Sequence, residues 1–167
     1  VSICLPHALH CPIALEAASA GKHVLCEKPI ACNARQAEEM AEAAEDAGLL
    51  LMEAFMYRFH PRSRLIKQMV DDGHIGTPRL VRSAFCQLMD EDEMAREDNI
   101  RLRPETGGGA LLDLGCYSAS VARWLMGGEP THAQGQAAYH PSGVDLHFVG
   151  SLRFPDGGLA TLEASFT

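Results

Sequence analysis

Residues 23–29 read His-Val-Leu-Cys-Glu-Lys-Pro, a short apolar run that ends in a charged pair and a proline. Such a run, bounded by polar residues, is typical of a buried strand. Helical composition and period flank it, over 10–20 before it and 33–47 after it, and further apolar runs occupy 1–5 and 49–52. Strand, helix, strand, helix, strand with short connections is the signature of a parallel sheet covered by helices. The first part of the chain is therefore predicted to be α/β.

Polar segments follow all three predicted strands, at 6–10, 27–29 and 53–58. Because ligands bind beyond the carboxyl ends of the strands in parallel sheets, we expect these segments to meet in one crevice. Pro29 fixes the backbone beside Lys28, so the ammonium could be aimed into that crevice, although an exposed surface lysine is the simpler interpretation of a Glu-Lys-Pro tripeptide.

After Pro61 the pattern changes. The sequence predicts a helix over 62–72, a polar and irregular connection over 88–106, and four strands over 79–87, 133–139, 145–154 and 159–166. Alternating strands joined by Asp-Gly and Pro-Ser-Gly turns indicate an open, mostly antiparallel sheet with helices on one face, so α+β. The change divides the chain into 1–60 and 61–167.

Residues 107–117 read Gly-Gly-Gly-Ala-Leu-Leu-Asp-Leu-Gly-Cys-Tyr and open a predicted helix. Asp113 and Tyr117 stand four residues apart, so they share one face of that helix. A carboxylate and a phenol beside a glycine turn could orient and protonate a substrate oxygen. They could equally form a polar helix start whose tyrosine is only packed.

The composition limits the classes of function. The chain has 167 residues and a net charge of -8, which argues against a nucleic-acid or anionic-membrane surface. No apolar run approaches the ~20 residues that cross a bilayer. Six cysteines without a Cys-x-x-Cys pair indicate free thiols in a reducing cytoplasm. His7, His10 and Cys11 have spacing that a metal could use, but without a matching second cluster we predict no metal site.

Both ends of the sequence suggest a part of a longer protein. The chain starts Val-Ser-Ile-Cys-Leu without a methionine, and it ends inside an alternating apolar run. The Gly-x-Gly-x-x-Gly turn that a dinucleotide fold needs is absent and is expected before Val1.

Four motifs in this order carry a resemblance to a known family: 6–10, 21–29, 53–61 and 107–117. The chain resembles the middle of the Gfo/Idh/MocA family of NAD(P)-dependent oxidoreductases. The resemblance implies that 1–60 is the C-terminal part of a Rossmann domain that binds NADP or NAD. It also implies that 61–167 is an incomplete sheet domain that closes the substrate pocket and builds a homo-oligomer, a dimer or tetramer.

The resemblance also implies roles for single residues. Lys28 would touch both cofactor and substrate, and Asp113 would position the substrate. Tyr117 stands where many members carry a histidine, as in the branch of glucose-fructose oxidoreductase, dihydrodiol dehydrogenase and xylose dehydrogenases, in which tyrosine is the proposed acid and base. A free phenol has a pKa of about 10, so we expect the Lys28 ammonium to lower the pKa of Tyr117.

The implied cofactor-binding residues lie at the three strand ends: Pro6, His7, His10, Glu27, Lys28, Pro29 and Arg58. For Arg58, an ion pair with a carboxylate such as Glu53 is an equally good interpretation. The expected reaction is hydride transfer between a nicotinamide cofactor and a hydroxyl or carbonyl carbon of a sugar, polyol or diol. A non-catalytic sensor of the same fold, or a related enzyme with a tightly held cofactor, remains an alternative.

Overall fold

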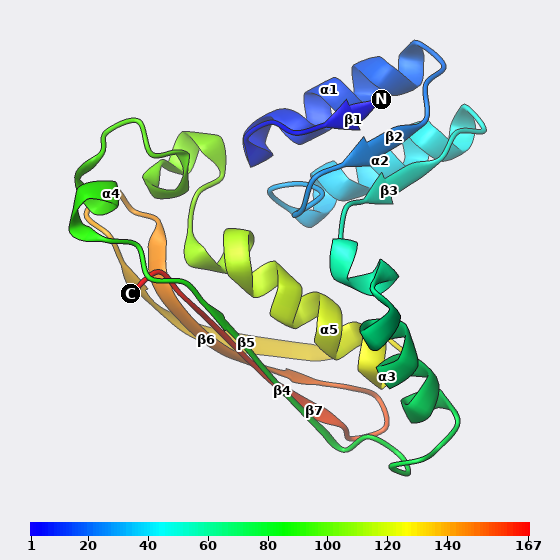
Figure 1. Ribbon diagram of the computed structural model, residues 1–167. Coiled ribbons are helices and arrows are strands. Elements are labelled where there is room, and N and C mark those ends of the chain that lie inside the picture. The colour runs from blue at the N-terminus through cyan, green and yellow to red at the C-terminus, as the bar shows by residue number, and fades with distance from the viewer.

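Three short parallel strands form the first sheet in the computed structural model, which describes residues 1–167. The strands β1 (Ser2–Ile3), β2 (Val24–Cys26) and β3 (Leu51–Glu53) are hydrogen-bonded in that order. Helices α1 (His10–Ser19) and α2 (Ala34–Asp46) connect them and pack against each other (Figure 1). The predicted α/β part is confirmed.

The sequence explains this layer residue by residue. Val24 and Cys26 point into the core with Met40 of α2, while Leu25 between them points away, as the two-residue period of a strand requires. Helix α2 begins where predicted, because the side chain of Asn33 accepts a hydrogen bond of 3.0 Å from the backbone N–H of Gln36.

The second sheet has four strands in the order β4-β7-β6-β5. Their bounds are β4 (Leu80–Cys86), β5 (His132–Tyr139), β6 (Asp145–Arg153) and β7 (Leu159–Ser165). The pairs β5–β6 and β6–β7 are antiparallel, which confirms the mostly antiparallel sheet, but β4 and β7 are parallel. A parallel pair needs a long crossover connection, and the chain between β4 and β7 supplies it.

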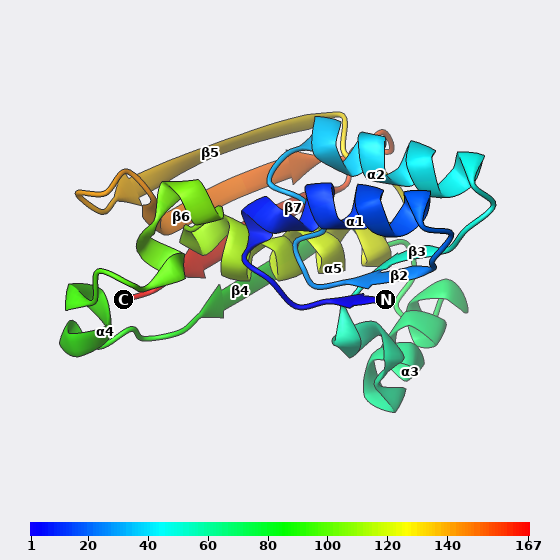
Figure 2. The same cartoon turned by 90° about the horizontal axis from the view of Figure 1, so that it is seen from above.

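Helix α5 (Cys116–Met126) lies along one face of this sheet, between the two sheets (Figure 1). Strand β7 alternates accordingly, with Ala160, Leu162 and Ala164 buried beneath the helix and Glu163 exposed. Seen from above, the first sheet and its helices cover one end of the second sheet, and α4 lies at the other end (Figure 2).

The remaining helices are short or irregular. Their bounds are α3 (Pro61–Asp71), α4 (Glu91–Ala95) and the 3₁₀ turns His7–Leu9, Met56–Phe59, Ile100–Leu102 and Pro104–Thr106. The helix predicted from the 107–117 motif is not uniformly α, because Leu111–Gly115 forms a π-helical turn before α5. Such turns occur frequently at functional sites. None of the helices combines the length and apolar character needed to cross a membrane.

Candidate active site

The ammonium of Lys28 reaches from the end of β2 to the π-helical turn. Its Nζ donates to the Oδ1 atom and to the backbone oxygen of Asp113, both at 2.7 Å. Only 15% of the Lys28 side chain and 12% of the Asp113 side chain are exposed. Folding therefore joins two predicted catalytic residues that lie 85 positions apart in the sequence.

A second cation, Arg101, completes the environment of the Asp113 carboxylate. Its Nε donates to Oδ2 at 2.8 Å, so both carboxylate oxygens are held. Burial alone would raise the pKa of Asp113, but hydrogen bonds and positive charge from Lys28 and Arg101 outweigh burial and lower this pKa. Sequence reasoning missed Arg101, because it is one of several arginines in the polar connection 88–106.

The glycine turn and Asp145 hold the π-helical turn in place. Oδ2 of Asp145 accepts a hydrogen bond of 2.6 Å from the backbone N–H of Leu111, which has no helical partner of its own. Gly109 has a φ of +115°, and a Cβ there would overlap Oδ1 of Asp145. A Cβ on Gly108 would lie 2.5 Å from the backbone oxygen of Arg101. The turn therefore needs glycine for close approach, as the motif suggested.

Tyr117 lies in a ring of aromatic side chains. Its ring centroid is 5.3 Å from Phe55, 5.3 Å from Phe85 and 6.2 Å from Tyr57. The hydroxyl donates to Sδ of Met56 at 3.7 Å. Sulfur is a weak acceptor, so this hydroxyl has no strong partner within the protein.

The expected effect of Lys28 on Tyr117 is wrong. Nζ of Lys28 lies 5.2 Å from the centroid of the Tyr117 ring, over its face, and its hydrogen bonds go to Asp113. Burial raises the pKa of Tyr117, and the neighbouring acidic groups of Cys116, Glu27 and Asp113 add to the rise. The phenol is therefore the stable form, because the carboxylate beside Lys28 offsets the charge that would have stabilised a phenolate.

A cavity of about 320 Å³ lies against Lys28, Asp113 and Arg101, but Tyr117 does not line it. Four of the predicted cofactor-binding residues line it together with Asp113: Pro6, His7, Glu27 and Lys28. They come from the carboxyl ends of β1 and β2, where the crevice was expected. His7 also reaches the glycine turn, since its Nδ1 lies 2.7 Å from the oxygen of Gly107, and burial lowers its pKa.

Three other residues predicted at the cofactor edge, His10, Pro29 and Arg58, do not line this cavity. His10 is fully buried, and its Nδ1 and Nε2 each lie 2.9 Å from a backbone oxygen, those of Pro29 and Leu5. No ring nitrogen of His10 is free for a ligand. Its side chain instead connects the chain segments that follow β1 and β2.

Arg58 lies outside this cavity and does not form the ion pair that was the alternative to cofactor binding. It forms no ion pair with Glu53, whose Oε1 accepts a hydrogen bond of 2.8 Å from the backbone N–H of Ile30. Its NH2 group instead donates to Oγ of Ser120 on α5 at 2.9 Å. The side chain therefore points to the second half of the molecule.

His7, His10 and Cys11 do not come together as metal ligands, because Cys11 Sγ lies 3.9 Å from Glu39 of α2. No three His, Cys, Asp or Glu side chains are grouped as a metal ion would require.

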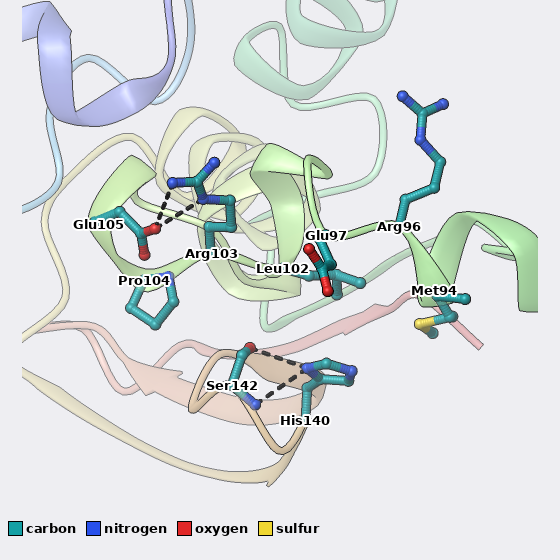
Figure 3. A pocket seen from close by; sticks show the side chains of 10 residues that line it. Met94, Arg96, Glu97, Leu102, Arg103, Pro104, Glu105, His140 and Ser142 are labelled. Carbon is teal, nitrogen blue, oxygen red and sulfur yellow. Dashed lines mark hydrogen bonds and ion pairs between the residues drawn. The ribbon is translucent and has the colours of Figure 1, made fainter.

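A larger cavity of about 690 Å³ lies between the connection 88–106 and the turn after β5 (Figure 3). Two pairs of its polar side chains bind each other, Arg103 with Glu105 and His140 with Ser142 (Figure 3). None of the predicted site residues lines it, so the smaller cavity is the candidate active site.

A parallel sheet whose carboxyl edge faces a helix on a second sheet is the arrangement of a two-part α/β protein with its ligand site between the parts. Family comparisons agree with this class. Residues 1–55 match the oxidoreductase family with an NAD-binding Rossmann fold, and residues 63–167 match the GFO/IDH/MocA C-terminal domain. The chain belongs to the Gfo/Idh/MocA family, which confirms the resemblance drawn from the four motifs.

Individual relatives are similar over nearly the whole chain. D-xylose 1-dehydrogenase (NADP(+)) 2 of Haloferax volcanii is 37% identical over 166 residues, covering 99% of this chain and 50% of that protein. The structure of aldose-aldose oxidoreductase from Caulobacter crescentus complexed with glycerol superposes with a TM-score of 0.90 at 32% identity, covering 99% and 50%. Levoglucosan dehydrogenase in complex with NADH and levoglucosan gives 0.89 at 31%, covering 99% and 47%. The chain spans about half the length of these relatives.

Proposed function

We propose that the whole protein transfers a hydride between a nicotinamide cofactor, NADP or NAD, and a hydroxyl or carbonyl carbon of a sugar, polyol or diol. One observation carries the proposal: Lys28 and Asp113, from different halves of the chain, meet at a cavity on the carboxyl edge of the parallel sheet. Relatives named for xylose, levoglucosan and dihydrobenzenediol support the substrate class, and names with NADP and NADH support both cofactors.

The cofactor would lie beside Pro6, His7, Glu27 and Lys28, and a nicotinamide ring there supplies or accepts the hydride. A cavity of about 320 Å³ at the strand ends fits the reacting end of such a molecule. The roles of His10, Pro29 and Arg58 as direct cofactor ligands stay predictions.

Three side chains bind the substrate and transfer its proton. Lys28 uses two of its three N–H groups on Asp113, which leaves one to donate to a substrate oxygen. Asp113 keeps free lone pairs and accepts from a neighbouring hydroxyl. Tyr117 holds a proton, because its pKa is raised, and gives it to the substrate oxygen in the reducing direction. The reverse, oxidising reaction starts from the phenolate that this transfer leaves, and its oxygen takes the proton of the substrate hydroxyl.

The test is Tyr117→Phe in the whole protein. We expect turnover to fall by about 10²- to 10⁴-fold, since general acid–base catalysis supplies a factor of that size, while cofactor affinity changes little. Tyr139→Phe, an exposed tyrosine of β5, serves as the control and should leave turnover unchanged. Unchanged turnover in Tyr117→Phe would show that the phenol is not the acid.

The same proposal includes the domain boundary, the oligomeric state and the cellular location. We place the boundary between the Rossmann part and the sheet part at residues 60 and 61, and family matches to 1–55 and 63–167 support it. Exposed apolar side chains on the strands, Leu80, Val149 and Leu159, support a homo-oligomer built through the sheet. Six free cysteines support a cytoplasmic location.

A further inference from the structure

Arg58 forms a joint between the two halves of the chain. It lies in the 3₁₀ turn Met56–Phe59 after β3, and its NH2 group donates to Oγ of Ser120 at 2.9 Å. Its Nε lies 3.4 Å from the hydroxyl of Tyr57, which itself lies 2.9 Å from the same Oγ atom. Ser120 is only 3% exposed and the other two residues are half-buried, so the buried hydroxyl finds its hydrogen-bond partners within the protein.

Aromatic rings from both halves surround the guanidinium. Its central carbon lies 5.6 Å from the ring of Trp124 on α5 and 5.9 Å from the ring of Phe55 after β3. Tyr57 also packs edge to face on Trp124 at 5.7 Å. Arg58 therefore combines hydrogen bonds with cation–π contacts, and its planar guanidinium can stack on rings while its fixed fork of N–H groups donates, which the compact ammonium of a lysine cannot reproduce.

The same contacts lead directly to Tyr117. Ser120 follows Tyr117 by three residues, so the two side chains lie on neighbouring positions of one helix face. The segment that carries Arg58 also contacts Tyr117. The ring of Phe55 packs on the Tyr117 ring with a centroid distance of 5.3 Å, and Sδ of Met56 accepts a hydrogen bond from the Tyr117 hydroxyl. The contacts of Arg58 and the proposed acid Tyr117 therefore involve the same helix, α5, and the same segment after β3.

We propose that Arg58 is a positioning residue, whose contacts with Ser120, Tyr57 and Trp124 fix the rotation of α5 and so hold the Tyr117 phenol beside Lys28. The proposal rests on the acid role of Tyr117 described above. It assigns Arg58 a function through Tyr117 in place of a direct contact with the cofactor.

A double-mutant cycle in the whole protein tests the proposal. Ser120→Ala removes the acceptor of Arg58, and we expect kcat to fall on the order of 10-fold with little change in KM, because small misplacements of a catalytic group are costly. Ser118→Ala is the matched control, since Ser118 is equally buried on α5 but bonds Ser83 of β4 instead.

If Arg58 acts through Tyr117, Ser120→Ala causes no further loss of kcat in a Tyr117→Phe background. A loss by the same factor in both backgrounds would overturn the proposal, since it would mean that the joint acts on stability or on another residue. Arg58→Lys keeps the charge but not the fork, and should resemble Arg58→Ala.

Fluorescence separates this proposal from the proposed function. Trp124 is the single tryptophan of these 167 residues. Its emission, taken as the difference between the whole protein and its Trp124→Phe variant, reports on the contacts of Arg58 without any turnover. We expect Arg58→Ala to shift or change the intensity of this emission, and Arg64→Ala, whose guanidinium lies on Phe59, to leave it unchanged. Unchanged emission in Arg58→Ala would refute the contact between Arg58 and Trp124 on which the proposal rests. A clear change in a protein without dehydrogenase activity would support the joint and refute the proposed function.

Discussion

Replacing Lys28 by methionine tests the contact on which the site depends. Methionine keeps the apolar stem of lysine but loses both hydrogen bonds to Asp113, each 2.7 Å long. A hydrogen bond to a charged group contributes about 1.5–3 kcal/mol, so two of them set an upper range of about 3–6 kcal/mol. Arg101 continues to hold the carboxylate, and the site is partly open to solvent. We therefore expect a loss near the lower end, about 3 kcal/mol.

The loss is measured by urea unfolding and by thermal melting at pH 7. For a folding unit of about 150–250 residues, about 3 kcal/mol corresponds to a decrease of about 6–12 °C in Tm. Lys67→Met is the matched control, because Lys67 pairs with Asp71 one turn along α3, at the surface. An exposed pair of this kind contributes about 0.5 kcal/mol or less. Equal losses in the two variants would refute the reasoning.

The pH dependence gives a second check on the same pair. The pKa of Asp113 is lowered in the folded protein, so its contribution to stability is complete above the unfolded value of about 3.9 and is lost as pH falls through the folded value. The difference in stability between the wild type and Lys28→Met should be constant from pH 7 to about pH 5 and shrink below about pH 4. A difference that is undiminished at pH 2 would mean that the charge of the Asp113 carboxylate does not contribute to it.

Three further predictions concern single sites. Gly109→Ala should reduce the free energy of unfolding by about 2 kcal/mol in urea titrations, because φ is +115° there and the new Cβ would overlap the Asp145 carboxylate. In the control Gly128→Ala the new Cβ meets no atom, so the free energy of unfolding should change little. His10→Ala removes a fully buried imidazole and leaves a backbone oxygen without its donor, so it should lower the free energy of unfolding by about 3 kcal/mol in the same measurement. A loss below about 1 kcal/mol would mean that His10 does not connect the segments that follow β1 and β2. Burial raises the pKa of Cys26 to about 12, so iodoacetamide at pH 8 should label exposed Cys86 but not Cys26 in the folded protein, as peptide mass spectrometry will show.

Local signals explain why much of the fold could be predicted from the sequence. The buried positions of β7 follow the two-residue alternation of Ala160, Leu162 and Ala164, and α2 begins at the asparagine that caps it. Both features depend on neighbours within a few residues. The mostly antiparallel second sheet followed from alternation and turn residues in the same way.

Features set by distant contacts could not be predicted in this way. The parallel pairing of β4 with β7 depends on strands that are far apart in the sequence. The π-helical turn is held by two distant contacts. Asp145 accepts a hydrogen bond from the first N–H of the turn, and Gly115 packs against β7 so closely that a Cβ would overlap Leu111 and press on Ala164. The composition and periodicity of the sequence do not indicate which distant residues these elements contact.

Arg101 illustrates the same limit within the site. The sequence identified 88–106 as a connection of the kind found at binding sites, yet this connection contains three arginines. Arg96 and Arg103 pair with nearby carboxylates, Asp98 and Glu105, two residues away. Arg101 has no such neighbour in the sequence and reaches Asp113 instead, so the absence of a local partner was the one signal that could have found it.

The pKa of Tyr117 shows what residue types alone do not determine. A lysine, an aspartate and a tyrosine were expected together, and folding brings their side chains within a few ångströms. Whether the phenol is acidic or basic then depends on which oxygen each N–H of Lys28 selects. With two of its N–H groups on Asp113, Lys28 brings little net charge to the ring, and burial outweighs it. Burial of the phenol, with the acidic groups near it, therefore raises the pKa of Tyr117, and burial depends on packing that the residue types alone do not reveal.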